Sequence, residues 1–216
     1  EYSEGAKRAY RELVTKPKFS LDTDRQAKLV RPLYMGLLTA EQEDFAKKRL
    51  IQALENYGWR LGTGFLSTPF ILFVLEKIGI EYAYKLLENE ELPGWLVMPK
   101  YGATTVWEDW EGDRASDQNA ASLNHYSKGA VCEWLMSEMC GIKVMGENQF
   151  LIAPKPGGSI TYAKAEYQSI YGKVACGWEK TEEGYRYTVT LPSNTTARLI
   201  LPDGREKMLS SGTYQL

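Results

Sequence analysis

The sequence has few of the residues that most often build metal and redox sites. It contains one histidine, His125, and three cysteines, none of which forms a CxxC pair. A zinc site of Cys and His ligands is therefore not expected, and the odd number of cysteines excludes a complete disulfide framework. Cys132 lies in an apolar helical pattern, so we expect it to be a small core residue. Nothing here implies a metal ion or an organic cofactor.

Long apolar runs and a strong net charge are also missing. The longest apolar run, near residues 70–75, is too short to cross a bilayer. The first residues, EYSEGAKRAYREL, are charged and helix-like, which is not the pattern of a signal peptide. The formal net charge of −2 gives no electrostatic reason to expect nucleic acid as a partner. With 44 % hydrophobic and 25 % charged residues, the composition is typical of a soluble globular protein.

The first part of the chain has the apolar spacing of helices. Thr39 is a good N-cap because Glu41 and Glu43 follow in the first turn and apolar residues then recur at helical spacing. Thr23 or Asp24 is expected to cap the preceding helix. The other expected helices cover residues 6–15, a helix that starts at Ser67-Thr68-Pro69, and residues 81–87 and 123–140.

The hydrophobic period changes near Gly141. Seven short, alternating segments rich in β-branched and aromatic residues follow, separated by turn sequences such as PKPGG, EKTEEG and LPDG. The expected strands are 143–144, 150–152, 160–167, 172–178, 185–191, 197–201 and 214–216. The pattern predicts an all-α part over residues 1–141 and a small antiparallel β-sandwich over residues 142–216.

The stretch TTVWEDWEG, Thr104–Gly112, mixes acids with tryptophans. Its acids are Glu108, Asp109 and Glu111, with Asp113 just beyond, and they alternate with Trp107 and Trp110. Tryptophan is costly to leave in water and a carboxylate is costly to bury, so the mixture suits a pocket with apolar walls and an acting carboxylate. The alternative, with about equal weight, is a structural loop whose acids cap a helix or face water.

Two further stretches are candidates for the same pocket. In ASLNHYSKGAV, Ser122 or Asn124 is a plausible N-cap, which places His125 in a first helical turn at the mouth of a helical bundle. A lone histidine is more often structural than catalytic. In LGTGFLSTPF, residues 61–70, the GxxxxGK[ST] pattern of a phosphate loop is absent. We expect a tight loop that brings Phe65 toward a central cavity.

Taken in order, these segments resemble the bacterial α-L-rhamnosidases, inverting glycoside hydrolases with an (α/α)6 barrel. The specific part of the match is GATTVWED, residues 102–109, followed by SLNHY, residues 122–126. GTGFLSTP before it, and AP, PGG, SIYG and LPSN after it, match more weakly. The resemblance covers most of the chain and implies part of an (α/α)6 toroid of helical hairpins followed by a β domain.

The resemblance implies roles for four residues. Glu108 matches the general base that activates water, and His125 matches a histidine that contacts the bound sugar. One or both of Trp107 and Trp110 would line the pocket, and no cofactor or metal is needed. The implied partner is a rhamnose-containing carbohydrate. Asp109 stands where the family commonly has Arg, and Glu111 where it commonly has Asp.

No segment here matches the family's general acid, which lies on the upstream half of the barrel. Six expected helices are also too few to close a ring, so we expect a fragment that is inactive alone and needs the upstream half. The alternative is a non-catalytic carbohydrate-binding or scaffold protein derived from a rhamnosidase. A polysaccharide lyase or another toroid glycosidase is disfavoured by the GATTxWE motif. The residues indicate no compartment, and export or a periplasmic location would suit an enzyme of external glycans.

Overall fold

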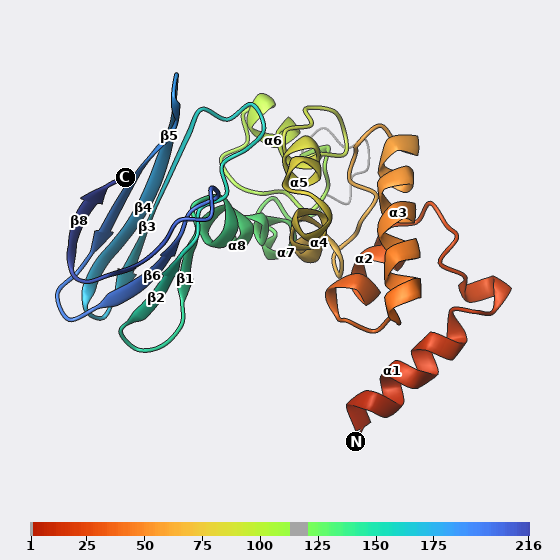
Figure 1. The fold of residues 1–216 in the computed structure, drawn as a ribbon. Coiled ribbons are helices and arrows are strands. Elements are labelled where there is room, and N and C mark those ends of the chain that lie inside the picture. Colours follow the sequence, from red (N-terminus) through yellow and green to blue (C-terminus); the bar gives the residue numbers. More distant parts are fainter. Residues whose placement is uncertain (1, 113–120) are drawn as a thin grey trace. The chain divides into compact units, whose positions relative to one another are not determined.

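The computed structural model describes residues 2–112 and 121–216. Helices come first along the chain and strands follow (Figure 1). The chain divides into two compact units, Glu1–Val131 and Cys132–Leu216. Residues 132–141 thus belong with the strands by their contacts, whereas the sequence predicted a domain boundary at residue 141.

The first unit is built from helical hairpins, in which α2 packs against α3 and α4 packs against α5 (Figure 1). Short 3-10 helices precede α2 and α4, at Pro17–Phe19 and Thr68–Phe70. The helices are α1 (Tyr2–Leu13), α2 (Gln26–Tyr34), α3 (Ala40–Asn56), α4 (Ile71–Ile78), α5 (Ile80–Leu87), α6 (Val97–Lys100), α7 (Tyr126–Gly129) and α8 (Val131–Trp134).

The start of α3 follows the chemistry predicted for it. The Thr39 hydroxyl accepts a hydrogen bond from the backbone N–H of Gln42 at 3.2 Å. The Gln42 side-chain oxygen accepts one from the backbone N–H of Thr39 at 3.1 Å, and the two bonds together make a capping box. The buried face of α3 consists of Ala46, Leu50, Ala53 and Leu54, which is helical spacing. The predicted cap of α2 was wrong, because Arg25 occupies the N-cap position and its side chain makes no capping bond.

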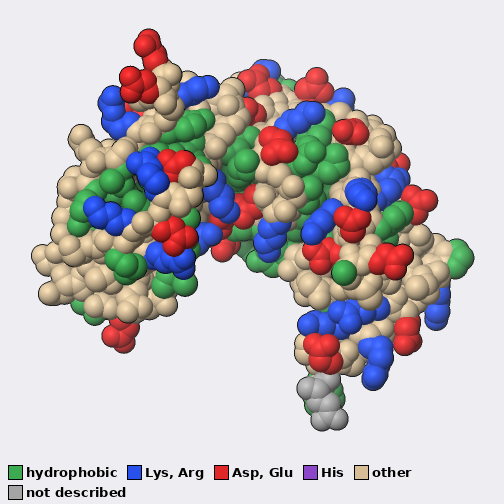
Figure 2. All heavy atoms as spheres, viewed as in Figure 1, with side chains coloured by type: hydrophobic (Ala, Val, Ile, Leu, Met, Phe, Trp, Pro, Cys, Tyr) green, Lys and Arg blue, Asp and Glu red, His purple; other side chains and the backbone are tan. Residues whose placement is uncertain are grey.

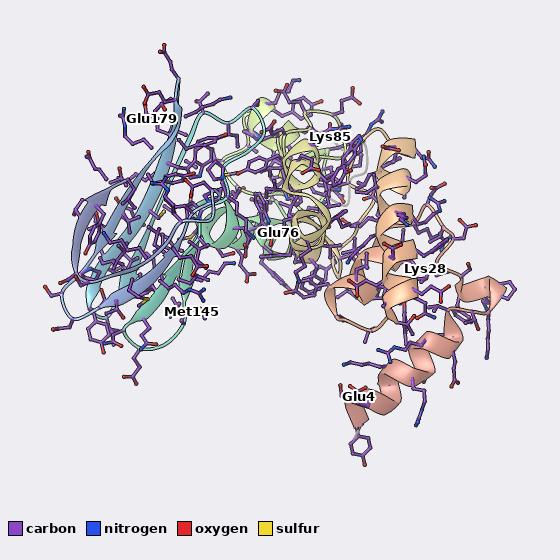
Figure 3. The ribbon with its side chains drawn as sticks, in the orientation of Figure 1. Glu4, Lys28, Glu76, Lys85, Met145 and Glu179 are labelled. Carbon is purple, nitrogen blue, oxygen red and sulfur yellow. The ribbon has the colours of Figure 1, made fainter. Side chains whose placement is uncertain are left out.

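Helix α1 differs from the others because it buries none of its residues. It extends away from α2–α5 (Figure 1), and its side chains, Glu4 among them, project around the helix (Figure 3). The Arg11 guanidinium ties it to the turn before α3 by donating to the carbonyls of Leu37 and Leu38. Among the described residues, α1 therefore contributes through a few polar bonds and no enclosed core.

The predicted helix over residues 123–140 is not continuous. It is broken into α7, α8 and a π-helical turn, Leu135–Met139. Cys132, expected in the core, is exposed, whereas Cys140 and Cys176 are buried. An apolar pattern fixes which residues favour burial, but each break in a helix rotates the following residues to a new face.

The second unit contains two four-stranded sheets, in the orders β1-β2-β6-β7 and β3-β4-β5-β8 (Figure 1). The pairings are antiparallel except that β2 and β6 are parallel. The last two strands lie close together in sequence, and the first of them, Glu206–Leu209, was not predicted. The strands are β1 (Ile142–Val144), β2 (Gln149–Ile152), β3 (Tyr162–Ser169), β4 (Gly172–Thr181), β5 (Gly184–Leu191), β6 (Thr196–Ile200), β7 (Glu206–Leu209) and β8 (Gly212–Gln215).

The core of the second unit comes from alternate residues of the central strands. On β5, Tyr187, Val189 and Leu191 are buried, and Thr188 between the first two is exposed. The Trp178 indole N–H donates to the Met139 carbonyl at 2.8 Å, which ties β4 to the end of the π-helical turn. This period of two is the reason the sequence predicts most of these strands correctly.

A buried carboxylate, Glu138, is held between two lysines of the second unit. Its side chain is 6 % exposed, and Lys143 Nζ and Lys155 Nζ each lie 2.6 Å from one of its oxygens. Burial raises the pKa of Glu138, but the hydrogen bonds from the two lysines outweigh burial and leave the pKa below its ordinary value. Because the pKa is lowered by folding, the stabilisation is complete above the unfolded-state pKa, about 4.3, and is lost as the pH falls below it.

We therefore expect Glu138→Gln to destabilise the protein by about 2 kcal/mol at pH 7, less than a fully enclosed pair because the lysines are partly exposed. The difference from the parent protein should shrink as the pH is lowered toward 3. Urea unfolding at several pH values measures this. Glu166→Gln is the matched control, since Glu166 also contacts two lysines but is 42 % exposed. An equal loss in both variants would contradict a special role for the buried carboxylate.

Lys and Arg side chains are interspersed with Asp and Glu side chains over the face drawn in Figure 2. None of the helices in the described ranges is long and apolar enough to cross a membrane.

Candidate active site

Two segments on either side of residues 113–120 lie side by side in the first unit, and they carry the candidate site. The Glu108 amide donates to the Ser122 carbonyl at 2.8 Å, and the His125 amide donates to the Val106 carbonyl at 2.7 Å. The Thr105 hydroxyl also donates to the Leu123 carbonyl. These bonds bring the TTVWEDWEG stretch beside the SLNHY stretch.

The side chains of Glu108 and His125 meet at this junction. His125 Nδ1 lies 3.8 Å from Glu108 Oε2, and the side chains are 15 % and 45 % exposed for His125 and Glu108 respectively. The Ser122 amide donates to the same Glu108 oxygen at 3.0 Å, which fixes the orientation of the carboxylate. A carboxylate that is held by the backbone yet open to solvent can contact a water molecule and a substrate at once.

His125 occupies a different place in its helix from the one predicted. Helix α7 begins at Tyr126, and His125 is its N-cap residue, with extended backbone angles and no side-chain capping bond. Neither Ser122 nor Asn124 caps the helix; the Ser122 hydroxyl instead bonds the backbone of Asn124. At the N-cap position the backbone of His125 is still extended, as in the loop before it, and the imidazole lies beside Glu108.

Two aromatic side chains lie against His125. The Phe65 ring lies 5.4 Å from the rings of both His125 and Tyr126, edge to face, and His125 stacks on Tyr126 at 5.6 Å. The Ser127 hydroxyl donates to the Phe65 carbonyl at 2.6 Å, which joins α7 to the Phe65 loop. Phe65 and Tyr126 are 46 % and 76 % exposed, so both offer apolar surface next to the Glu108–His125 pair.

The loop that carries Phe65 is fixed by buried polar groups. The Gln26 amide group donates to the Arg60 carbonyl and accepts the Gly62 amide, both at 2.8 Å, although Gln26 is only 1 % exposed. Further along, the hydroxyls of Thr63 and Thr68 bond at 2.9 Å. These bonds replace regular secondary structure in positioning the loop. That the loop brings Phe65 toward a central cavity stays a prediction.

Trp107 is 6 % exposed and packs inside the loop. A Cβ on Gly112 would lie only 2.1 Å from its ring, so the glycine, at φ +60°, lets the loop close over the indole. The Trp107 amide contacts the Met98 sulfur at 3.4 Å. Its surroundings give Trp107 a packing role, and its contact with sugar stays a prediction.

Trp110 is held from two sides. Trp95 meets it edge to face at 6.2 Å, and Lys128 Nζ lies 3.8 Å from the centroid of its ring. The Trp95 indole N–H donates to the Lys128 carbonyl at 3.1 Å, which closes the cluster. Burial lowers the pKa of Lys128 to about 8, although the charges of Asp109 and Glu108 oppose that shift.

The sequence did not predict that Lys128 and Trp95 belong to this cluster. No motif marks a lysine that contacts a tryptophan 18 residues away, as Lys128 contacts Trp110.

The other acids of the stretch differ from Glu108 in their surroundings. Asp109 and Glu111 are exposed, and Asp113 lies outside the described residues. In the described parts of the chain, no group of three or more His, Cys, Asp or Glu residues is arranged to hold a metal ion. The arrangement thus offers one oriented carboxylate, one imidazole and exposed aromatic rings.

Comparison with known proteins decides the family. The family model described as the bacterial alpha-L-rhamnosidase 6 hairpin glycosidase domain matches residues 1–139, and the bacterial alpha-L-rhamnosidase C-terminal domain matches residues 145–215. The chain belongs to the bacterial α-L-rhamnosidase family. The predicted fold class, helical hairpins followed by a β domain, is confirmed by this match and by the structure.

Individual relatives agree with the family match. An alpha-L-rhamnosidase of Streptomyces avermitilis is 36 % identical over 83 % of this chain, and one of Formosa agariphila is 37 % identical over 87 %. The crystal structure of the Streptomyces avermitilis enzyme complexed with L-rhamnose aligns with a TM-score of 0.81 at 32 % identity, over 89 % of this chain and 21 % of the other. An Aspergillus terreus alpha-L-rhamnosidase aligns with a TM-score of 0.85 at 27 % identity, over 100 % of this chain and 26 % of the other. The chain spans only 18 % and 21 % of the two curated relatives.

Proposed function

We propose that this chain supplies the base-bearing part of an α-L-rhamnosidase active site, which removes terminal α-L-rhamnose from glycans or glycosides. The observation that carries the proposal is the Glu108–His125 pair, 3.8 Å apart, with exposed aromatic rings beside it. Family membership and a relative that was crystallised with L-rhamnose support the choice of sugar.

In the proposed reaction, the Glu108 carboxylate takes a proton from a water molecule while the water oxygen attacks the anomeric carbon. The bond from that carbon to the glycosidic oxygen breaks, and a second carboxyl group protonates the departing oxygen. His125 hydrogen-bonds a sugar hydroxyl. Aromatic rings contact the C–H face of the sugar, with Trp110 and Trp107 as the predicted walls and Phe65 and Tyr126 at the exposed side.

The second carboxyl group is proposed to come from sequence outside these 216 residues. Inversion needs two carboxyl groups about 6.5–9.5 Å apart, with water between one of them and the anomeric carbon. The relatives are much longer than this chain, so their upstream sequence has room for the rest of the toroid. On this proposal, the upstream half of the enzyme is a required partner and the chain alone is inactive.

The stereochemistry of the first product tests this function. We expect the protein made from its complete coding sequence to hydrolyse an aryl α-L-rhamnoside and to release the β anomer of L-rhamnose first. Proton NMR during the first minutes detects that anomer before mutarotation, and an aryl β-D-glucoside is the control substrate. Early release of the α anomer would contradict a base role for Glu108. L-rhamnose binding without hydrolysis would favour the non-catalytic carbohydrate-binding alternative.

A further inference from the structure

Lys128 is an unusual residue to find next to the loop that carries Glu108. It lies in α7, three residues after His125, and is only 7 % exposed. Lysine is rarely buried to this extent without a compensating partner, because removing an ammonium group from water is costly. Its position therefore calls for a compensating interaction in the surrounding residues.

The compensation comes from a ring and from two nearby acids. Lys128 Nζ lies 3.8 Å from the Trp110 ring centroid, within the range in which a cation is attracted to the face of an indole. The charged groups that the described residues present to Lys128 are Asp109 and Glu108, both from the loop. Its other close neighbour, Trp95, donates to the Lys128 carbonyl and carries no charge.

We propose that Lys128 is a positioning residue, whose positive charge holds the Trp110 indole and the Glu108–Asp109 segment in place beside the proposed sugar site. Its effect on turnover rests on the proposed function, whereas its hold on Trp110 does not. With one face of the indole covered by Lys128 and an edge facing Trp95, Trp110 has few orientations open to it.

The attraction of Lys128 to the Trp110 indole and to the two acids should weaken as the pH rises. Burial lowers the pKa of Lys128 to about 8, so the side chain carries its charge at pH 7 and loses it as the pH rises through 8. Loss of the proton removes both the attraction to the indole and the attraction to the two acids. Arginine stays charged throughout this range and also stacks on aromatic faces. The position of the Trp110 indole should therefore change near pH 8 with lysine at this position, and should not change there with arginine.

Two variants, Lys128→Met and Lys128→Arg, test the proposal in the protein made from its complete coding sequence. Methionine keeps an apolar stem of similar length and avoids a buried charge, so folding should be retained, as circular dichroism checks. We expect Lys128→Met to lower kcat/KM for an aryl α-L-rhamnoside about tenfold at pH 7 and Lys128→Arg to restore most of it. The activity of Lys128→Arg relative to the parent protein should rise above pH 8. Lys100→Met, which changes an exposed lysine, is the matched control.

Tryptophan fluorescence gives a readout that does not need activity. Subtracting the pH titration of Trp110→Phe from that of the parent protein isolates the Trp110 signal, which should change near pH 8 and stay flat in Lys128→Met and Lys128→Arg. A transition that persists in Lys128→Met overturns the proposal, as does full activity of that variant at pH 7. If the parent protein hydrolyses no rhamnoside, the proposed function fails, and the fluorescence titration still decides the role of Lys128.

Discussion

Replacing Glu108 by glutamine is expected to lower kcat for an aryl α-L-rhamnoside by roughly 10²–10⁴-fold, the usual contribution of a general base. Glutamine has the same shape, and its amide oxygen can still accept the Ser122 N–H that holds the Glu108 carboxylate. What it cannot do is take a proton from water. The loss should therefore appear in kcat, with an unchanged melting temperature and little change in the affinity for L-rhamnose.

Glu111→Gln is the matched control for this experiment. It makes the same chemical change three residues away, at an exposed carboxylate of the same loop, and should leave kcat within about twofold. Near-normal turnover of Glu108→Gln would sink the assignment, and a large loss in Glu111→Gln instead would move the base to that residue.

Chemical rescue separates a base from a merely structural carboxylate. In Glu108→Ala, an azide ion can enter the space vacated by the side chain and attack the anomeric carbon without giving up a proton. The second carboxyl group still protonates the departing oxygen, so rhamnosyl azide of inverted configuration should form and turnover should recover. A structural carboxylate would not be replaced by azide, and turnover would then stay low.

The sequence predicted the helical hairpins and most strands because their apolar periods are local. The capping box at Thr39 follows from neighbouring residues alone. The sequence predicted Phe45, Leu50, Ile51 and Leu54 as the apolar positions of α3, and of these the structure buries only Leu50 and Leu54. The parallel pairing of β2 with β6 does not follow from neighbouring residues, because it joins residues 47 positions apart, such as Gln149 and Thr196, and depends on the packing of the whole unit. The break in the predicted 123–140 helix was missed because the apolar pattern of these residues suits a continuous helix.

For the candidate site, short motifs were informative and single residues were not. GATTVWED and SLNHY, through their resemblance to the family, indicated that Glu108 and His125 belong to one site, and the structure places their side chains 3.8 Å apart. Their proposed roles remain predictions. Trp107 and Trp110 looked equivalent in sequence, yet one is enclosed by Gly112 and the other lies against Lys128. That difference arises from tertiary contacts that no local pattern records.

Gly141→Ala is expected to cause the largest loss of stability that a single added methyl group produces in the second unit. Gly141 follows the π-helical turn and has φ +79°, a left-handed conformation in which helices often end on glycine. An alanine Cβ there would lie 2.2 Å from Pro154 N and 2.3 Å from the Ala153 carbonyl carbon. Both are backbone atoms, so no side-chain rotation relieves the overlap.

The backbone must therefore move, and the hydrogen bond from the Ala153 amide to the Gly141 carbonyl, 2.8 Å long, would be strained or lost. Backbone strain and overlap together should cost about 3 kcal/mol or more in the free energy of unfolding, measured by urea denaturation at pH 7. Gly146→Ala is the control, because its added Cβ would meet nothing closer than Gln149 Cβ at 3.9 Å. Equal stability of the two variants would show that the 141–154 contact yields easily, and that the left-handed turn does not fix where the β domain begins.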